Sequence, residues 1–165
     1  MALPRPVVRR LRAAHALLQA GDYAQAAGAF ETIAEEAGTL GLPLAAPLSV
    51  EAGVAWILAG ELGRGLTIAE RGLDWLHEGE PGPRVAMLRD RVLEALQKTG
   101  HASETNALLQ KYAAHTSPPL TVPRGHLPAS CPQCGGRVRP DEVEWVDGST
   151  AVCDYCGSIL QADKG

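Results

Sequence analysis

The stretch AAHALLQAGDYAQAAGAF, residues 13–30, carries the pattern that decides the fold of this 165-residue chain. An apolar run that includes Leu17 and Leu18 ends at Gly21, and a second apolar run follows immediately. Glycine accepts the left-handed backbone that ends many helices, so this stretch predicts two helices joined by a tight turn. Glycines at positions 60 and 100 follow comparable runs, and a period of about 40 residues is typical of a helical repeat.

Prolines mark the joints between these helix pairs, because proline cannot continue a helix. They occur at positions 43 and 47, at 81 and 83, and at 118 and 119. We therefore expect six helices, over residues 6–20, 23–37, 47–60, 62–78, 83–99 and 102–115. An irregular all-α bundle whose periodicity is accidental is the alternative.

Small and aromatic residues recur through the first pair, at Ala14, Gly21, Asp22, Tyr23, Ala26 and Phe30. This pattern resembles a tetratricopeptide repeat. The second unit is similar, with Gly53 at the small position and Ala69 at the aromatic one, and the third departs further, with Leu93 at the small position. The resemblance covers about residues 6–115 and implies about three stacked helical hairpins, a tetratricopeptide-like α-solenoid. Because the period exceeds the 34 residues of that family, other helical-hairpin repeats stay open.

All four cysteines form two Cys-x-x-Cys-Gly segments, Cys131 with Cys134 and Cys153 with Cys156. The 18 residues between the pairs match the spacing of zinc sites. Four thiolates fill a tetrahedral shell, so we expect one structural Zn²⁺ and no open catalytic position. Iron, held as in rubredoxin, is the less favoured metal, since sulfur ligation alone does not separate the two. Disulfides are a further alternative.

Between the cysteine pairs, alternating residues around Val138, Val143 and Trp145 and at Ala151-Val152 predict short strands. The segment resembles a zinc ribbon over about residues 129–162. A module of this size is too small to fold without help, so bound metal would supply its stability.

Residues 116–129 contain four of the twelve prolines, including Pro118 and Pro119, and this composition predicts an extended linker. We therefore expect three parts: a tetratricopeptide-like domain over residues 1–115, the linker over 116–129 and a zinc ribbon over 130–165. The expected fold class is mainly α with a small β module. His126 is expected to be a linker residue and not a metal ligand.

The chain has 15 Lys and Arg against 19 Asp and Glu, so no overall field attracts nucleic acid or an anionic membrane. No apolar run reaches the length needed to span a bilayer. We expect a cytoplasmic protein, although the arginine-rich first 21 residues could alternatively mimic a transit peptide. The chain contains no phosphate-binding loop, zinc-protease motif or nucleophile elbow, and we do not expect an enzyme.

Summed over the three expected pairs, positive charge is in excess on the first helices and negative charge on the second helices. If the repeats stack as the resemblance implies, the first helices line a concave basic face. We expect that face to bind an acidic peptide or protein segment through five arginines: Arg9, Arg12, Arg84, Arg89 and Arg91. The net-acidic ribbon is itself a candidate ligand, through intramolecular docking. The alternative is that these charges belong to solvated faces.

These features together favour a non-enzymatic adaptor for protein–protein interaction, with a helical-repeat groove and a structural zinc ribbon. The first alternative is a transcription or translation factor whose ribbon contacts nucleic acid, although the acidic ribbon argues against such contact. The second is a rubredoxin-like electron carrier.

Overall fold

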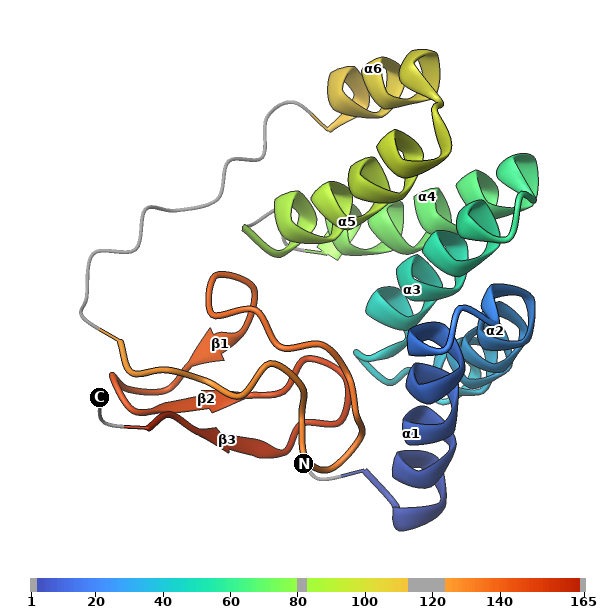
Figure 1. Cartoon of the computed structure of the whole chain (residues 1–165). Coiled ribbons are helices and arrows are strands. Elements are labelled where there is room, and N and C mark those ends of the chain that lie inside the picture. Colours follow the sequence, from blue (N-terminus) through green and yellow to red (C-terminus); the bar gives the residue numbers. More distant parts are fainter. Residues whose placement is uncertain (1–2, 80–82, 113–123, 164–165) are drawn as a thin grey trace.

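The computed structural model describes residues 3–79, 83–112 and 124–163 (Figure 1). This part of the chain contains six helices: α1 (Arg5–Gln19), α2 (Tyr23–Thr39), α3 (Ala45–Leu58), α4 (Leu62–Gly79), α5 (Pro83–Thr99) and α6 (Ala102–Lys111). The expected number and order of the helices are confirmed, with small differences at their ends. The expected extension of the last helix to residue 115 lies partly outside the described residues.

The three hairpin turns share one local structure. Gly21, Gly60 and Gly100 have φ angles of 82°, 91° and 81°. In each turn the residue after the glycine donates its backbone N–H to the carbonyl five residues earlier, at 2.9 Å. This is the bond that closes a helix with a left-handed glycine, so the repeated glycines end the first helix of every pair.

Helix α3 lies at the centre of the helical domain and packs against α2, α4 and α5. Eleven of its 14 residues are buried. It approaches α4 closely at Gly53. A Cβ atom there would come within 2.6 Å of the Ala69 backbone, so only glycine fits at this position.

The buried apolar side chains form two clusters that meet at α3. The first cluster includes Leu11 of α1, Phe30 of α2 and Leu48 of α3, together with the four cysteines and Leu160 of the C-terminal module. The second cluster is built from α3, α4, α5 and α6. The C-terminal module therefore shares an apolar core mainly with the first three helices, together with Ile68 of α4.

The C-terminal module, called the ribbon below, has a three-stranded antiparallel sheet in the order β1-β2-β3. The strands are β1 (Glu144–Trp145), β2 (Thr150–Val152) and β3 (Ile159–Gln161). The run around Val138 was expected to form a strand, but it has only an isolated bridge between Ser130 and Arg137. Strand β3, which the sequence did not indicate, completes the sheet by pairing with β2, and its Leu160 is buried.

The second half of the expected linker lies along this sheet. Gly125 donates its backbone N–H to the carbonyl of Gly148 at 3.0 Å, and His126 exchanges two backbone bonds with Asp163. Residues 116–123 of the expected linker fall within 113–123, outside the described residues.

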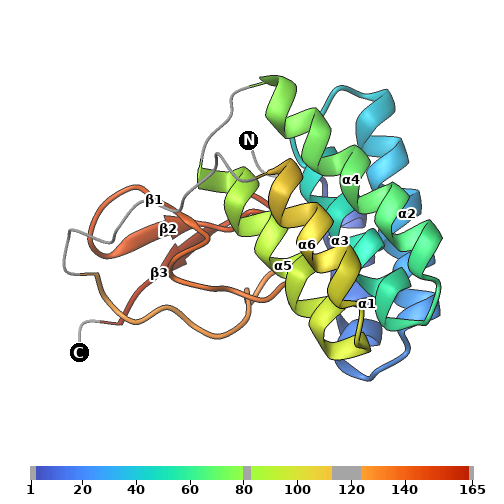
Figure 2. The ribbon, with the colours of Figure 1, turned by 90° about the horizontal axis from the view of Figure 1, so that it is seen from above.

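The ribbon lies on one side of the helical layer, beside α1 and below α5 in the view of Figure 1. Seen from above, it projects from the side of α5, with α2 and α4 on the far side (Figure 2). We call the side formed by α1, α3 and α5 the inner face. No helix among the described residues is long and apolar enough to cross a membrane.

Candidate metal centre

The four cysteines converge at one buried point. Their sulfur atoms all lie within 4.8 Å of one another. The Sγ atoms of Cys131 and Cys156 are 3.7 Å apart, and those of Cys134 and Cys153 are 3.8 Å apart. Metal–thiolate bonds of about 2.3 Å in a tetrahedron place neighbouring sulfurs about 3.8 Å apart, whereas a disulfide requires about 2 Å. The four sulfurs therefore fit the ligand shell of a metal ion.

Each cysteine pair sits on a turn of the same design. In the first knuckle, residues 131–136, Cys131 donates its N–H to the carbonyl five residues later and its own carbonyl accepts from Gly135. The second knuckle, residues 153–158, repeats both bonds from Cys153, with Gly157 as the donor. Gly135 and Gly157 have φ angles of 74° and 68°, which other residues rarely adopt. The glycine after each pair is thus required by the turn that aims both sulfurs inward.

Hydrogen bonds between the thiols shift their pKa values in opposite directions. Hydrogen bonding by Cys134 lowers the pKa of Cys131 far below its ordinary value, and the same contact raises the pKa of Cys134. The hydroxyl of Ser158 lies 3.2 Å from the sulfur of Cys131 and 3.0 Å from that of Cys156. A hydroxyl at this distance can donate to a thiolate, so Ser158 favours negative charge on these two sulfurs.

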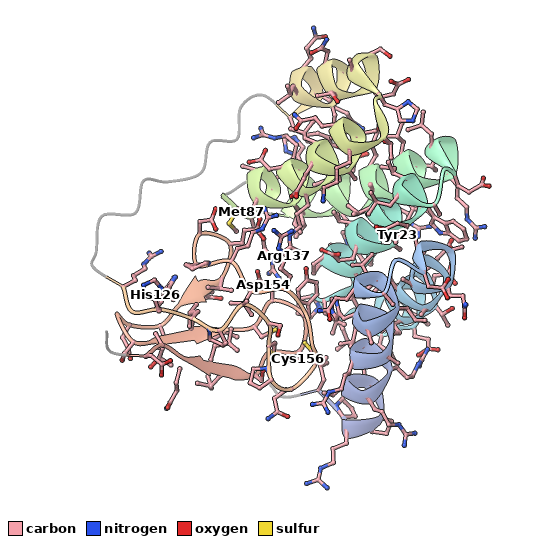
Figure 3. All side chains as sticks on the ribbon, viewed as in Figure 1. Tyr23, Met87, His126, Arg137, Asp154 and Cys156 are labelled. Atoms are coloured by element: carbon pink, nitrogen blue, oxygen red, sulfur yellow. The ribbon has the colours of Figure 1, made fainter. Side chains whose placement is uncertain are left out.

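His126 is separate from this cluster. Figure 3 shows its side chain well apart from Cys156, and its backbone pairs with the last strand region of the ribbon. It was expected to be a linker residue, but it pairs with Asp163 of the ribbon, and it is not among the described residues that could ligate the ion.

The first knuckle rests against α1. The guanidinium of Arg12 donates to the carbonyl oxygens of Pro132 at 2.8 Å and of Gln133 at 2.7 and 3.0 Å. Gln19 donates to the carbonyl of Gly135 at 3.3 Å. Pro132 and Gln133 lie between the two cysteines of the pair, so the segment that shapes half of the metal site is also the segment that contacts the helix.

The second knuckle also contacts the helices. It does so through Tyr155, which lies between Cys153 and Cys156. The Tyr155 ring meets that of His15 in α1 edge to face, with centroids 4.7 Å apart. Its hydroxyl donates to Glu51 of α3 at 2.6 Å. His15 is 3% exposed, and its Nε2 atom has no hydrogen-bond partner. Burial lowers the pKa of His15, so the ring that packs on Tyr155 is neutral at pH 7.

Arg91 of α5 joins the helices to the ribbon through a buried ion-pair network. It pairs with Glu51 of α3 and with Glu142 of the ribbon, and the bonds to Glu142 measure 2.5 and 2.8 Å. It also contacts the Tyr155 hydroxyl. Burial opposes its charge, but the two carboxylates outweigh burial and raise the pKa of Arg91. A buried arginine between two buried carboxylates is costly to unpair, so the network fixes how the three elements meet.

A second set of ion pairs extends this network to the surface. Arg139 of the ribbon bonds to Glu142 at 3.1 Å and to Glu94 of α5 at 2.6 Å. Asp154 of the second knuckle lies 3.8 Å from Arg84 of α5. Figure 3 shows Asp154 and Arg137 on the side of the ribbon that faces the helices.

The five arginines expected to bind a partner have different environments. Arg12, Arg84 and Arg91 contact the ribbon, as described above. Arg89 bonds to a carboxylate of its own helix and to a backbone carbonyl beyond α6. Arg9 is exposed on α1. The structure therefore brings three of the five to one place, where the ribbon's own groups are their neighbours.

Sequence reasoning missed several residues of this arrangement: His15, Glu51, Glu94, Glu142, Tyr155 and Ser158. Two of them had a signal. Glu51 is the only acid in the otherwise apolar α3, which indicates a buried partner, and Tyr155 stands between two metal ligands. The remaining contacts depend on how two separate modules meet, and no local pattern predicts that.

Comparisons of the chain with protein-family models, with curated proteins and with solved structures find no match.

Proposed function

We propose that the protein is a non-enzymatic adaptor, in which tetratricopeptide-like helical hairpins and a structural zinc ribbon together present a binding surface to another protein. The observation that carries this proposal is that the two knuckles both form the metal site and contact the helices. The residues between the cysteines of each pair shape the metal site and also contact α1, α3 and α5.

Zinc is the metal that best suits this role. Four thiolates leave no open position for a substrate, and zinc has no redox chemistry of its own. When bound by Cys131, Cys134, Cys153 and Cys156, the ion would supply conformational stability to a module too small to fold alone. The chain's own residues then do the remaining work, because Arg12 and Tyr155 connect the knuckles to the helices.

The adaptor role rests on the charge of the inner face. Arginines on α1 and α5 point their charge to the side where the acidic ribbon lies, and helical repeats commonly use the face lined by their first helices to bind extended segments. An acidic protein segment is the ligand class that complements such a face. The second helices carry most of the acids and would remain on the solvent side.

Two measurements on the full-length protein test this proposal. Elemental analysis after metal-replete purification should find about one zinc per colourless chain, and a red protein with visible ferric-thiolate absorption would instead indicate an electron carrier. Affinity capture from native extract should recover protein partners that survive nuclease treatment. Partners that are lost with nuclease would replace the adaptor with a nucleic-acid-associated factor.

A further inference from the structure

A hollow lies beside the two knuckles, between the start of α1 and strand β3 of the ribbon. It has a volume of about 540 Å³. Its charged lining is Arg5, Arg9 and Arg12, and its apolar lining includes Leu3, Val8 and Ile159. Pockets of about 300–1,000 Å³ accept ligands of the size of a few residues. We call this hollow the α1 groove.

The arginines of the α1 groove lie on one face of the helix. Arg5, Arg9 and Arg12 follow one another at intervals of four and three residues, which places their side chains one above the other. No carboxylate lines the groove among the described residues. Their neighbour Arg10 is turned away and pairs with Glu36 of α2. Apart from the sulfur of Cys156 in its ribbon wall, the described part of the groove presents three guanidinium groups and no carboxylate, in a chain that is negative overall.

The groove is partly preorganised by the ribbon. Three hydrogen bonds to the first knuckle hold the Arg12 guanidinium in place through its Nε and Nη2 atoms. Ser158 and Ile159 of the ribbon form the opposite wall. Ile159 is 58% exposed, so its apolar surface is open to a ligand in the hollow. Fixed walls reduce the entropy that a ligand must lose on binding.

We propose that the α1 groove binds an acidic peptide segment that also carries aliphatic side chains. This inference rests on the proposed adaptor function and places its ligand at a site distinct from the surface where the ribbon contacts α3 and α5. The carboxylates of the segment pair with Arg5 and Arg9, since the planar guanidinium grips a carboxylate with two parallel bonds. Its aliphatic side chains cover Leu3, Val8 and Ile159.

A peptide suits this groove better than nucleic acid. Nucleic-acid binding depends on a track of cations long enough to neutralise several phosphates. The basic groups here are confined to one helix, and the wall opposite them is apolar and belongs to a net-acidic ribbon. Acidic and aliphatic groups in one ligand match both halves of the groove.

The test uses a fluorescein-labelled ten-residue peptide of eight glutamates and two leucines, with the full-length zinc-loaded protein. The peptide should bind, and in ¹⁵N NMR spectra its shifts should concentrate on residues 5–12 and 156–160. An Arg5→Gln/Arg9→Gln variant should bind at least tenfold more weakly. Arg10→Gln is the matched control, from the same helix but outside the groove, and should change affinity less than twofold. Ile159→Ser should weaken binding about threefold.

Three other results would overturn the proposal in different ways. Binding with shifts on α5 and unchanged affinity in the Arg5→Gln/Arg9→Gln variant would overturn the groove while leaving an adaptor function standing. Equal weakening by Arg9→Gln and Arg10→Gln, each made singly, would reduce the effect to overall charge and overturn the site. Tighter binding of a twelve-nucleotide oligothymidine at the same residues would overturn the peptide and the adaptor together.

Discussion

The ribbon contacts α1 and α5 by different means. On the α1 side, side chains bond to backbone carbonyls of the first knuckle, and the rings of His15 and Tyr155 pack edge to face. On the α5 side, the contacts are ion pairs from Arg91 and Arg139 to carboxylates. The α1 side also belongs to the apolar cluster that contains the cysteines, whereas the second apolar cluster, which includes α5, contains no ribbon residue.

The contacts on the α1 side and those on the α5 side therefore depend on different properties of the protein. The carbonyl oxygens of a knuckle point at Arg12 only when the turn has its proper shape, so the α1 side depends on the metal centre. The ion pairs depend on charge, and the exposed ones among them weaken with salt. Removal of metal should therefore affect α1 most, and added salt should affect the surface pairs of α5 most.

The largest effect is expected from Cys134→Ser, which removes a metal ligand. Structural zinc contributes about 10–16 kcal/mol of apparent binding free energy in small zinc modules, so the variant ribbon should lose its fixed structure. Near-ultraviolet circular dichroism should fall because Trp145 and Tyr155 become mobile, while the far-ultraviolet helical signal should largely persist. Unchanged near-ultraviolet dichroism in a zinc-free variant would contradict the dependence of the α1 side on metal.

Arg91→Met should come next, because it leaves Glu51 and Glu142 buried without their cation. Breaking a buried pair in this way costs about 3–5 kcal/mol, to be measured by urea unfolding. The matched control is Arg10→Met, whose partner Glu36 is exposed, and we expect about 0–1 kcal/mol from it. Equal losses in the two variants would show that the buried network does not hold the ribbon to α5.

Gly136→Ala probes the α1 side without changing any charge. A Cβ at this position would lie 2.5 Å from the Tyr155 ring and 3.0 Å from Nε2 of His15. Overpacking of this kind costs about 1–3 kcal/mol in the free energy of unfolding. Gly28→Ala in α2 meets no atom within 4 Å and should instead stabilise by about 1 kcal/mol. Stabilisation by both alanines would mean that the first knuckle does not approach Tyr155 and His15 this closely.

The smallest effect is expected from Glu94→Gln, on the exposed edge of the α5 side. The bond from Arg139 lowers the pKa of Glu94, so the carboxylate is fully ionised at pH 7 and favours the docked ribbon. Its loss should cost about 0.5–1 kcal/mol in low salt, since the side chain is partly exposed. Thermal melting of wild type and variant should converge in 1 M NaCl, and a difference that persists there would show that charge is not the cause.

The helices could be predicted from the sequence because their signals are local. Gly21, Gly60 and Gly100 each end a helix by the same left-handed turn, and the cysteine spacing alone indicated which four side chains meet. Expected and observed helix ends differ where another residue acts first. Helix α2, for example, was expected to end at residue 37 but continues to Thr39, and Gly41, with φ of 67°, closes it.

The meeting of the two modules could not be predicted, because it joins residues more than 40 positions apart. Arg91 was expected to face a partner, yet its neighbours are Glu51 and Glu142, from opposite directions along the chain. Strand β3 was missed for a similar reason. Residues 159–161 are too short to show alternation, and they become a strand by pairing with β2.

Amide hydrogen exchange, measured on the zinc-loaded protein and again after chelation, tests most directly whether the metal centre holds the ribbon on the inner face. We expect α1 to lose protection along with residues 131–160, because the knuckles that contact it lose their shape. Helices α4 and α6, whose buried side chains belong mostly to the second apolar cluster, should keep theirs. Unchanged protection of α1 after complete removal of zinc, or equal loss in all six helices, would contradict it.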